Sequence, residues 1–587
     1  IMPGIVTFAA TAMMAAVGGL VLRAAKDQNV SAFALAAVLA ISGYVALSPP
    51  LLAVAAVWTI ALAALGTAFF GAGGTRRGVG LLVRTAPWAL LLNLWWIVPN
   101  VMTLLTKTET LQLRSVFDIT WRHARLNLAN VVSLSGHLWT WDLPHLFPYA
   151  ASLDRLPWGL LKFALPLLAL LAVVTVPRNR MRPVLVLIGL SLPLLFVGKG
   201  LHEPLASVNA FLYRHVPGMW LLRNPLSKVA PVLLLAYVAL AAMALEYAFQ
   251  RWGSSKPIRR LIPWSMVALV GAALVYPTPL WTGDVIRDDE PPSVFSRYVG
   301  VPEAWSSVAS FVNALPETGK VLVLPVPYQY LVATTWGYYG VDVIPRYLLE
   351  QPTIQVRQRA QFAERPPFNS LLQTVQSSLS AGDSGKAVPA LRALGVTYVI
   401  VRHDVPPRLP STLPNYYHRR ISPDYRPVEA SLRASPEVTV VHQSDVATVF
   451  QLRTENAGFI GTAGPRVAWR RVGPSKYEVQ VPPTRTGLVL ELRETFDRGW
   501  RLEGVPDGRL AQHVIAHGYA NAWRISPGAG FQARISYGPD RLYYAAIVIS
   551  AITALTALAL VVMRRRRSAA PTDLETESRK VASSTVP

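Results

Sequence analysis

Long apolar runs recur along the chain and are separated by short polar stretches. Nine of these runs approach the roughly 20 residues that an α-helix needs to cross a bilayer. They cover residues 4–23, 31–48, 51–71, 85–105, 156–176, 183–198, 229–249, 261–281 and 543–563. The sequence Ser48-Pro49-Pro50 between the second and third runs is typical of a tight turn. The pattern predicts a multi-span α-helical membrane protein.

Clusters of Arg and Lys occur at alternate junctions between the runs. The clusters are Arg23 and Lys26; Arg76, Arg77 and Arg84; Arg178, Arg180 and Arg182; Arg251, Lys256, Arg259 and Arg260; and Arg564 to Arg567. If the runs alternate across the membrane, all clusters fall on one side, which should be cytoplasmic. We therefore expect a multi-pass plasma-membrane protein with residue 1 outside and the C-terminus in the cytoplasm. An outer N-terminus without a start signal also leads us to expect membrane helices upstream of residue 1.

The stretch between the last two runs has the composition of a soluble ectodomain with two halves. The first half alternates helix-like pieces such as "PEAWSSVASFVNALPETG" with strand-like pieces such as "KVLVLPVP", which indicates an α/β fold. The second half has short alternating strands such as "KYEVQV" and "FQARISYG", which indicate a β-sandwich. The expected domains are a polytopic membrane domain at 1–282 with external loops 106–155 and 199–228, an extracytoplasmic α/β domain at 283–455, an extracytoplasmic β-sandwich at 456–542, a final membrane helix at 543–563, and a disordered cytoplasmic tail at 564–587.

Composition and motif content exclude several kinds of site and partner. The chain is 52% hydrophobic and 15% charged, and its formal net charge is +23. Because much of the basic excess lies in clusters between apolar runs, we expect a lipid bilayer and not nucleic acid as the partner. The absence of Cys excludes disulfides, thiolate metal sites and a Cys nucleophile. The sequence also contains no P-loop, dinucleotide fingerprint, HExxH or GxSxG motif.

Two basic residues lie on the expected outer side, where such residues are normally sparse. In "RNPLSK", Arg223 and Lys228 flank the predicted start of a membrane helix at Asn224-Pro225. A helix N-terminus favours an anion and disfavours cations, so a bound anion would account for both basic residues. The phosphate of a lipid carrier is the natural candidate outside a membrane. The alternative is that the two side chains reach ordinary lipid headgroups.

External loop 106–155 is rich in aromatic and charged residues. Trp and Tyr favour the membrane interface, so the loop could simply lie there. Alternatively, it could cover a carbohydrate, with aromatic faces stacking on sugar rings and carboxylates binding hydroxyl groups. The residues that would do so are Trp121, Trp139, Trp141, Asp118 and Asp142.

A second acidic group follows the eighth apolar run. Asp288, Asp289 and Glu290 offer oxygen ligands that could bind a divalent cation such as Mg²⁺ or Mn²⁺. Pro291 and Pro292 follow at once, which favours the alternative of a solvated linker.

Several stretches resemble a known family, the actinobacterial arabinofuranosyltransferases of the GT-C superfamily, and within it the α-(1→3) enzymes. They are "LLLNLWWIVPN" at 90–100, "LLRNPLSKV", "GKVLVLPVPYQYLVATTWGYYGVD" with Trp336-Gly337, "LRALGVTYVIVRHD" with Arg402 and Asp404, and "ETFDRGWRLEGVPDG" with "HGYANAWRI". The resemblance implies a GT-C-like fold and transfer of a sugar, arabinofuranose in this family, from a polyprenyl-phosphate donor to a cell-envelope glycan such as the arabinan of the cell wall. GT-C enzymes place a catalytic Asp or Glu in the first external loop, which would lie upstream of residue 1 in this shorter chain.

We therefore expect a membrane glycosyltransferase in which Arg223 and Lys228 bind the donor phosphate. A carboxylate must act as general base for the acceptor hydroxyl. Asp118, Asp142 and Glu203 are the external candidates, and no motif distinguishes among them. The alternative is a non-catalytic, membrane-anchored protein that binds glycans or assists envelope assembly.

Overall fold

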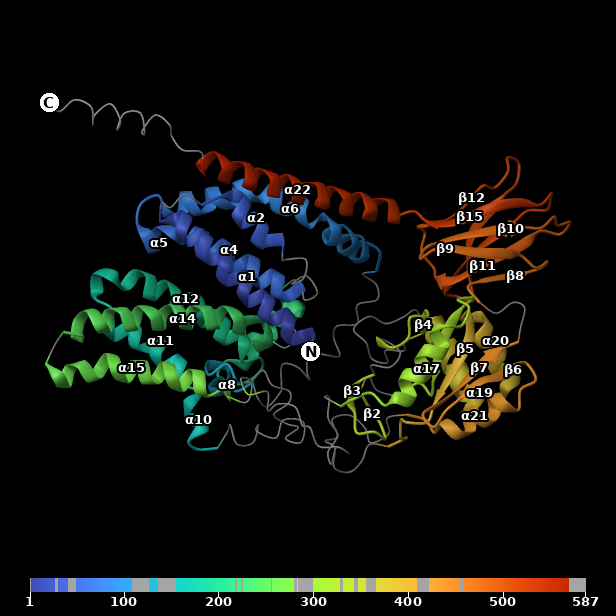
Figure 1. Cartoon of the computed structure of the whole chain (residues 1–587), viewed down its shortest axis with the longest axis horizontal. Coiled ribbons are helices and arrows are strands. Elements are labelled where there is room, and N and C mark those ends of the chain that lie inside the picture. The colour runs from blue at the N-terminus through green and yellow to red at the C-terminus, as the bar shows by residue number, and fades with distance from the viewer. Residues whose placement is uncertain are drawn as a thin grey trace, which may run out of the picture.

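The structure is a computed structural model of the whole chain. It describes residues 2–26, 30–40, 49–107, 126–135, 155–216, 219–222, 225–254, 256–278, 282, 299–327, 331–342, 347–354, 366–408, 422–453 and 458–569. Three parts are visible: a helical bundle, an α/β unit and a β-sandwich from which a long helix returns to the bundle (Figure 1).

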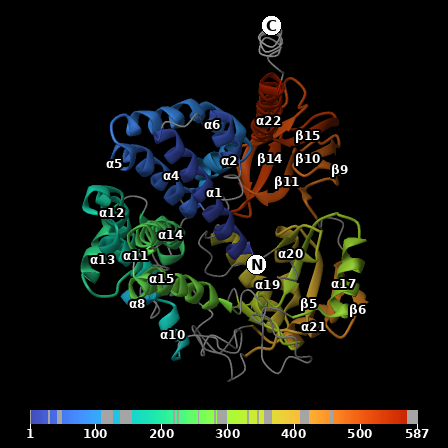
Figure 2. The same ribbon diagram turned by 60° about the vertical axis from the view of Figure 1, so that its left-hand side comes forward.

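Helices in the bundle form two groups (Figures 1 and 2). The first group contains α1 (Met2–Ala25), α2 (Ala32–Ala40), α4 (Pro49–Ala64), α5 (Gly66–Phe70), α6 (Gly74–Lys107) and the last helix, α22 (Asp540–Ala569). The second contains α8 (Leu128–Val132), α10 (Trp158–Leu161), α11 (Ala164–Thr175), α12 (Met181–Gly198), α13 (Ala206–His215), α14 (Pro225–Trp252) and α15 (Pro257–Val275). One buried apolar core, which includes Val17, Trp58 and Tyr237, joins the two groups.

Helix lengths confirm the membrane character and refine the expected spans. Among the described residues, five helices are long and apolar enough to cross a membrane: α6, α12, α14, α15 and α22. Shorter apolar helices cover Ala9–Ala25, Leu51–Ala64 and Ala164–Thr175. The fold class expected from the sequence, a multi-span membrane protein with a β-rich soluble part, is confirmed.

Two of the expected spans are broken in the structure. The run 51–71 divides into α4 and α5, because the hydroxyl of Thr75 donates to the carbonyl oxygen of Ala64 (2.8 Å) and accepts from the amide of Thr67 (3.1 Å). These bonds fix a sharp turn that leads into α6. The run 156–176 divides into α10 and α11, and Lys162 lies at the break. Both breaks occur where polar groups find partners outside their own helix.

The bundle has two chemically different ends. At one end α1 terminates beside the start of α6, where the guanidinium of Arg77 donates to the carbonyl oxygen of Ala25 (2.9 and 3.1 Å). We call this the basic end, because α12 and α15 also begin here with Arg-rich segments. At the opposite end α12 terminates and α14 begins, on the side of the sheet-containing units (Figure 1). We call this the sheet end.

The α/β unit is built on a five-stranded mixed sheet. Its order is β4-β1-β5-β7-β6, with β1 parallel to β4 and β5, and β7 antiparallel to β5 and β6. The strands are β1 (Lys320–Leu324), β4 (Thr353–Ile354), β5 (Val396–Arg402), β6 (Val438–Gln443) and β7 (Ala447–Leu452). A hairpin of β2 (Leu331–Ala333) and β3 (Tyr339–Val341) follows β1.

Helices cover both faces of this sheet, so its central strands are buried on both sides. Val321 and Val323 pack against α17 (Glu303–Asn313), whereas Leu322 and Leu324 face the opposite layer. That layer consists of α19 (Pro366–Ser380), α20 (Ser384–Ala393) and α21 (Tyr425–Arg433). The uninterrupted apolar sequence of β1 and β5 therefore follows from burial on two faces.

The β-sandwich consists of two four-stranded antiparallel sheets, ordered β12-β15-β10-β9 and β13-β14-β11-β8. Its strands are β8 (Ile460–Ala463), β9 (Ala468–Gly473), β10 (Lys476–Val481), β11 (Leu488–Thr495), β12 (Trp500–Glu503), β13 (Ala511–Ala516), β14 (Ala520–Ile525) and β15 (Phe531–Tyr537). Alternate residues such as Tyr477, Val479 and Val481 point into the shared core.

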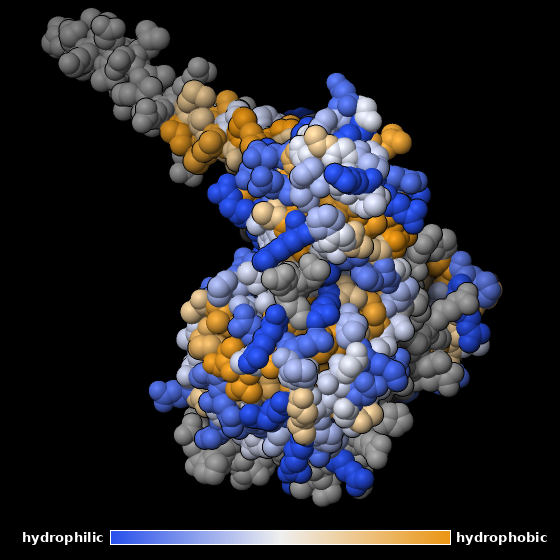
Figure 3. Space-filling model, turned by 90° about the vertical axis from the view of Figure 1, so that its right-hand side faces the viewer, coloured by the Kyte–Doolittle hydropathy of each residue, from blue (hydrophilic) through white to orange (hydrophobic). Residues whose placement is uncertain are grey.

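Buried polar contacts join the sandwich to the α/β unit. The hydroxyl of Tyr519 donates to the carbonyl oxygen of Ala393 (2.7 Å), and Tyr519 itself is fully buried in the α/β core. The ammonium of Lys320 donates to the carbonyl oxygen of Arg493 across the same junction. Viewed toward the end of the molecule that carries the sheets, the surface is a mixture of hydrophilic and apolar patches (Figure 3). The expected domain limits at residues 282, 455 and 542 stay a prediction.

Candidate functional site at the sheet end of the bundle

The start of α14 lies at the sheet end, as the sequence predicts. A short 3-10 helix, η5 (Met219–Leu222), precedes it and contacts α4 and α13. Pro225 occupies the first turn, where its missing N–H group costs nothing. Leu226 and Ser227 are buried, and Lys228 is half-buried in the same turn. Arg223, the second residue of the predicted phosphate site, lies outside the described residues.

Helix α8, which lies within the expected loop 106–155, packs against the start of α14. Val131 belongs to a small apolar core that also contains Leu226 and Val229 of α14. The last residue of α12, Gly198, faces it: a Cβ atom there would lie 3.1 Å from Cγ1 of Val131 and 3.2 Å from Cγ2 of Val229. The absence of a side chain at Gly198 therefore lets the loop, α12 and α14 meet closely.

Three lysines flank this meeting point. Lys162 Nζ donates to Oδ1 of Asn130 in α8 (3.3 Å). Lys199 follows Gly198, is 1% exposed, and its Nζ donates to the carbonyl oxygen of His202 (2.6 Å). Lys228 precedes Val229. Lys162 and Lys199 were not expected from the sequence, because only their neighbours in space reveal that they belong with Lys228.

Carboxylates are scarce in this region. In the described stretches at the sheet end, 126–135, 155–160, 199–216 and 219–222, Glu203 is the only acidic residue. It is exposed, and its Oε2 accepts a long hydrogen bond from the amide of Ala206 at the start of α13 (3.4 Å). The other predicted residues of this region, Asp118, Asp142, Trp121, Trp139 and Trp141, lie outside the described residues.

Two of the stretches that resemble the family, the one with Trp336-Gly337 and the one with Arg402 and Asp404, meet inside the α/β unit. Arg402 and Asp404, each 2% exposed, pair through Nε and Oδ1 (2.8 Å) and through Nη2 and Oδ2 (3.0 Å). The indole N–H groups of Trp305 (2.9 Å) and Trp336 (2.8 Å) also donate to Oδ2 of Asp404. Arg402 also donates through Nη1 to Oδ1 of Asp342 (2.7 Å), which completes the network. Sequence reasoning missed Trp305 and Asp342, although a charged pair directly after a buried strand indicates such partners.

Electrostatics keep this network ionised. Burial alone would raise the pKa of Asp404, but the charge of Arg402 and the hydrogen bonds from Arg402, Trp336 and Trp305 outweigh it and lower the pKa. The pKa of Arg402 is raised despite its burial, because Asp342 and Asp404 stabilise the cation. The network therefore holds the β2–β3 hairpin through Trp336 and acts as a positioning element.

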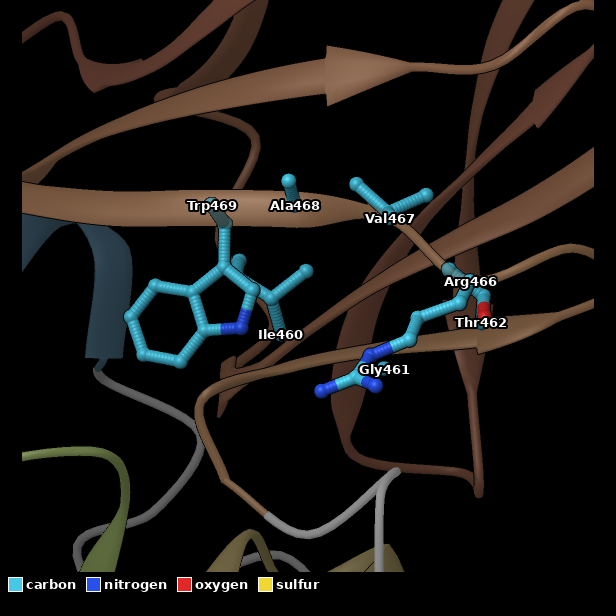
Figure 4. Close-up of a pocket in the computed structure, with 7 residues that line it drawn as sticks. All are labelled: Ile460, Gly461, Thr462, Arg466, Val467, Ala468 and Trp469. Atoms are coloured by element: carbon cyan, nitrogen blue, oxygen red, sulfur yellow. The ribbon is translucent and has the colours of Figure 1, made fainter.

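The sandwich contains a cavity between the edge strands β8 and β9, with a volume of about 420 Å³. Trp469 forms one wall, and the guanidinium of Arg466 extends toward the side on which this indole lies (Figure 4). The buried hydroxyl of Thr462, also in the lining, has no hydrogen-bond partner in the structure. An aromatic face, a cation and a hydroxyl group suit a hydroxyl-rich ligand.

No group of three or more His, Asp or Glu residues that could hold a metal ion occurs within the described part of the chain. The predicted divalent-cation ligands Asp288, Asp289 and Glu290 lie outside that part. Their assignment stays a prediction.

Together these features define a polytopic membrane protein with a lysine-rich site at one end of its bundle and an α/β and β-sandwich assembly at the same end. Residues 6–430 match the family model described as "Alpha-(1->3)-arabinofuranosyltransferase, N-terminal GT-C domain". Because the match covers most of the chain, the protein belongs to this family, which confirms the family resemblance.

Known proteins similar to this chain include a curated one and several solved structures. The alpha-(1->3)-arabinofuranosyltransferase of Mycobacterium tuberculosis (strain ATCC 25618 / H37Rv) is 30% identical over 118 residues, which are 20% of this chain and 8% of that protein. A cryo-EM structure of a mutant of arabinofuranosyltransferase AftD from mycobacteria has a TM-score of 0.47 and 13% identity, over 91% of this chain and 49% of that chain. A second AftD structure has a TM-score of 0.39 and 14% identity, over 89% and 48%. The chain thus spans about half the length of these solved relatives.

Proposed function

We propose that this chain takes part in moving a sugar, arabinofuranose, from a polyprenyl-phosphate donor to a cell-envelope polysaccharide. The family supplies the reaction class. One observation carries the donor assignment: Lys162, Lys199 and Lys228 gather where α14 begins. Cations at a helix N-terminus oppose the helix dipole, and a phosphate bound there would relieve the conflict.

In an inverting transfer, the acceptor hydroxyl oxygen bonds to the anomeric carbon while the bond from that carbon to the phosphate oxygen breaks. The polyprenyl phosphate leaves with the electron pair, and a carboxylate takes the hydroxyl proton. We assign Lys228 and Arg223 to the departing phosphate, whose growing charge they stabilise. Asp118, Asp142 and Glu203 stay candidates for the base, and Trp121, Trp139 and Trp141 stay candidates for stacking on the sugar. A divalent cation held by Asp288, Asp289 and Glu290 is compatible with this scheme.

This function requires the sheet end to face outward. Support comes from the charge distribution, because the Arg-rich segments that begin α12 and α15 lie at the basic end. We therefore place residues 283–542 outside the cytoplasm and the C-terminus inside, in the plasma membrane.

A transfer assay tests the donor assignment. The full-length protein, reconstituted in lipid, is given a synthetic polyprenyl-phosphate arabinofuranose and an arabinan oligosaccharide. We expect Lys228→Ala and Arg223→Ala each to reduce transfer at least about tenfold, since each removes a charge-assisted contact of about 1.5–3 kcal/mol. Lys386→Ala, at an exposed position in the α/β unit, is the matched loss of a positive charge and should leave transfer unchanged. Unchanged transfer by the Lys228 and Arg223 variants would overturn the assignment.

The cavity lined by Thr462, Arg466 and Trp469 favours a second candidate function, glycan binding without transfer. The same reconstituted protein distinguishes glycan binding from sugar transfer. Binding of the arabinan oligosaccharide with no transfer from any polyprenyl-phosphate sugar would support the binding protein, whereas transfer would support the enzyme.

A further inference from the structure

Helix α13, which follows α12 at the sheet end, buries a polar residue and exposes large apolar ones. Its polar residue Asn209 is fully buried, whereas Leu205, Val208 and Phe211 are 59%, 41% and 58% exposed. Val208 and Phe211, which are three residues apart, share one face of the helix, and Leu205 is the residue directly before its first turn. A water-facing helix would show the opposite arrangement.

Polar contacts hold the helix in this orientation. The amide of Asn209 donates to the carbonyl oxygens of Phe196 in the last turn of α12 (2.7 Å) and of Gly200 in the turn that follows it (2.6 Å). Lys199 fastens the connecting turn through the carbonyl oxygen of His202. Rotating α13 to bury its apolar face would break both bonds from Asn209 and leave these two carbonyl groups without this donor.

Helix α13 follows a helix whose surface must contact lipid. Helix α12 is one of the membrane-spanning helices, and its Leu185 and Leu192 are 59% and 60% exposed. Helix α13 begins at Ala206, eight residues after α12 ends at Gly198, so it lies at the level where the span leaves the bilayer. Arg214 and His215 at its last turn are exposed and complement lipid phosphates.

We propose that α13 is an interfacial helix, with Leu205, Val208 and Phe211 immersed at the boundary between headgroups and acyl chains of the adjacent leaflet. The occupant of this face is the bilayer itself. Because α13 contacts η5, the helix also fixes the depth at which the chain enters the start of α14. This inference rests on burial and hydrogen bonds alone and holds whether or not the protein transfers a sugar.

The absence of Cys makes a direct test possible. Full-length variants Val208→Cys and Phe211→Cys are labelled with a nitrobenzoxadiazole fluorophore and placed in phosphatidylcholine nanodiscs. Lys386→Cys is the control, because the Lys386 side chain is 77% exposed on the α/β unit. We expect blue-shifted emission at positions 208 and 211, and quenching by nitroxide-labelled lipid about threefold stronger than at position 386.

Aqueous iodide should show the opposite order of quenching. Equal iodide quenching at all three positions would show that the face is in water and would overturn the proposal. Protection from both quenchers at positions 208 and 211 would show that protein covers the face, which would overturn it as well. Circular dichroism of each labelled variant checks that the fold is retained.

Discussion

The hydroxyl group of Ser550 donates a hydrogen bond to the carbonyl oxygen of Leu91 (2.8 Å), joining α22 to α6. The hydroxyl oxygen of Ser550 also accepts from the amide of Trp95, one turn further along α6 (3.2 Å). Ser550 is 6% exposed, so this contact lies inside the packed interface. Next to it, Asn93 donates to the carbonyl oxygen of Leu39 in α2 (3.3 Å). The "LLLNLWW" stretch is therefore where α6 is bonded to helices on two sides.

Replacement of Ser550 by Ala should loosen this interface. Hydrogen bonds between membrane helices contribute about 0.6 kcal/mol on average and up to about 1.7 kcal/mol. We expect Ser550→Ala to lower the thermal midpoint of unfolding in detergent by a few degrees. Thr556→Ala is the control, because the Thr556 hydroxyl is exposed and bonds only within its own helix. Equal midpoints for the two variants would show that the Ser550 contact is energetically neutral.

Replacement of Asp404 should unfold the α/β unit locally. Asp404→Asn removes the charge that pairs with buried Arg402, and breaking a buried pair by removing one partner costs about 3–5 kcal/mol. Hydrogen exchange measured by mass spectrometry should show faster exchange in β5 and in the β2–β3 hairpin. Asp507→Asn, at an exposed loop position, should leave both segments protected.

The stability of the same unit should depend on acid pH. The pKa of Asp404 is lower in the folded state than its ordinary value of 3.8. Its contribution is therefore complete above that value and is lost as pH falls from about 4 through the folded-state pKa. Unfolding monitored between about pH 6 and pH 2 should show this loss in the wild type and a smaller one in Asp404→Asn. Identical pH profiles would contradict the ionised state assigned to Asp404.

Tyr519 should contribute measurably to the junction between the sandwich and the α/β unit. Tyr519→Phe deletes its buried hydrogen bond and leaves the carbonyl oxygen of Ala393 without this donor, at a cost of about 1–2 kcal/mol. The control is Tyr544→Phe, because Tyr544 is 57% exposed. Chemical denaturation, monitored by tryptophan fluorescence, compares the unfolding midpoints of the two variants. Equal midpoints would show that the Tyr519 hydrogen bond does not stabilise the junction.

Thr462→Val should separate ligand binding from stability in the sandwich cavity. The Thr462 hydroxyl is buried without a partner, so its replacement by an apolar group of the same shape should leave stability unchanged or raise it by about 1 kcal/mol. If a glycan binds there, the variant should weaken arabinan binding by about fivefold through one lost hydrogen bond of about 1 kcal/mol. Isothermal titration of the full chain with the oligosaccharide measures this change, and unaltered affinity would place the glycan elsewhere.

The apolar pattern predicts the described helices well because burial in lipid demands long apolar segments, whatever the helices pack against. It fails at residues 64–75 and near Lys162, where polar side chains break helices by bonding to other segments. It also places the start of α6 at residue 85, whereas the helix begins at Gly74. Hydropathy detects only the part of a helix that lies in lipid, and Arg76, Arg77 and Arg84 extend α6 beyond it.

The candidate site was predicted less completely, for a related physical reason. Lys228 could be found from its own helix start, because capping is local in sequence. Lys162 and Lys199 join it only through Asn130 and Val131 of α8 and Gly198 of α12, two segments that are distant from Lys228 in the sequence. Contacts between segments so distant in sequence leave no periodic signal in any one of them.

The chain enters the sheet-containing units from α15, in the second helical group, and returns through α22, which packs on α6 in the first. The soluble part therefore links the two halves of the bundle outside the membrane. Only Gly538 and Pro539 separate β15 of the sandwich from α22, so a shift of α22 within the bilayer would carry the sandwich with it.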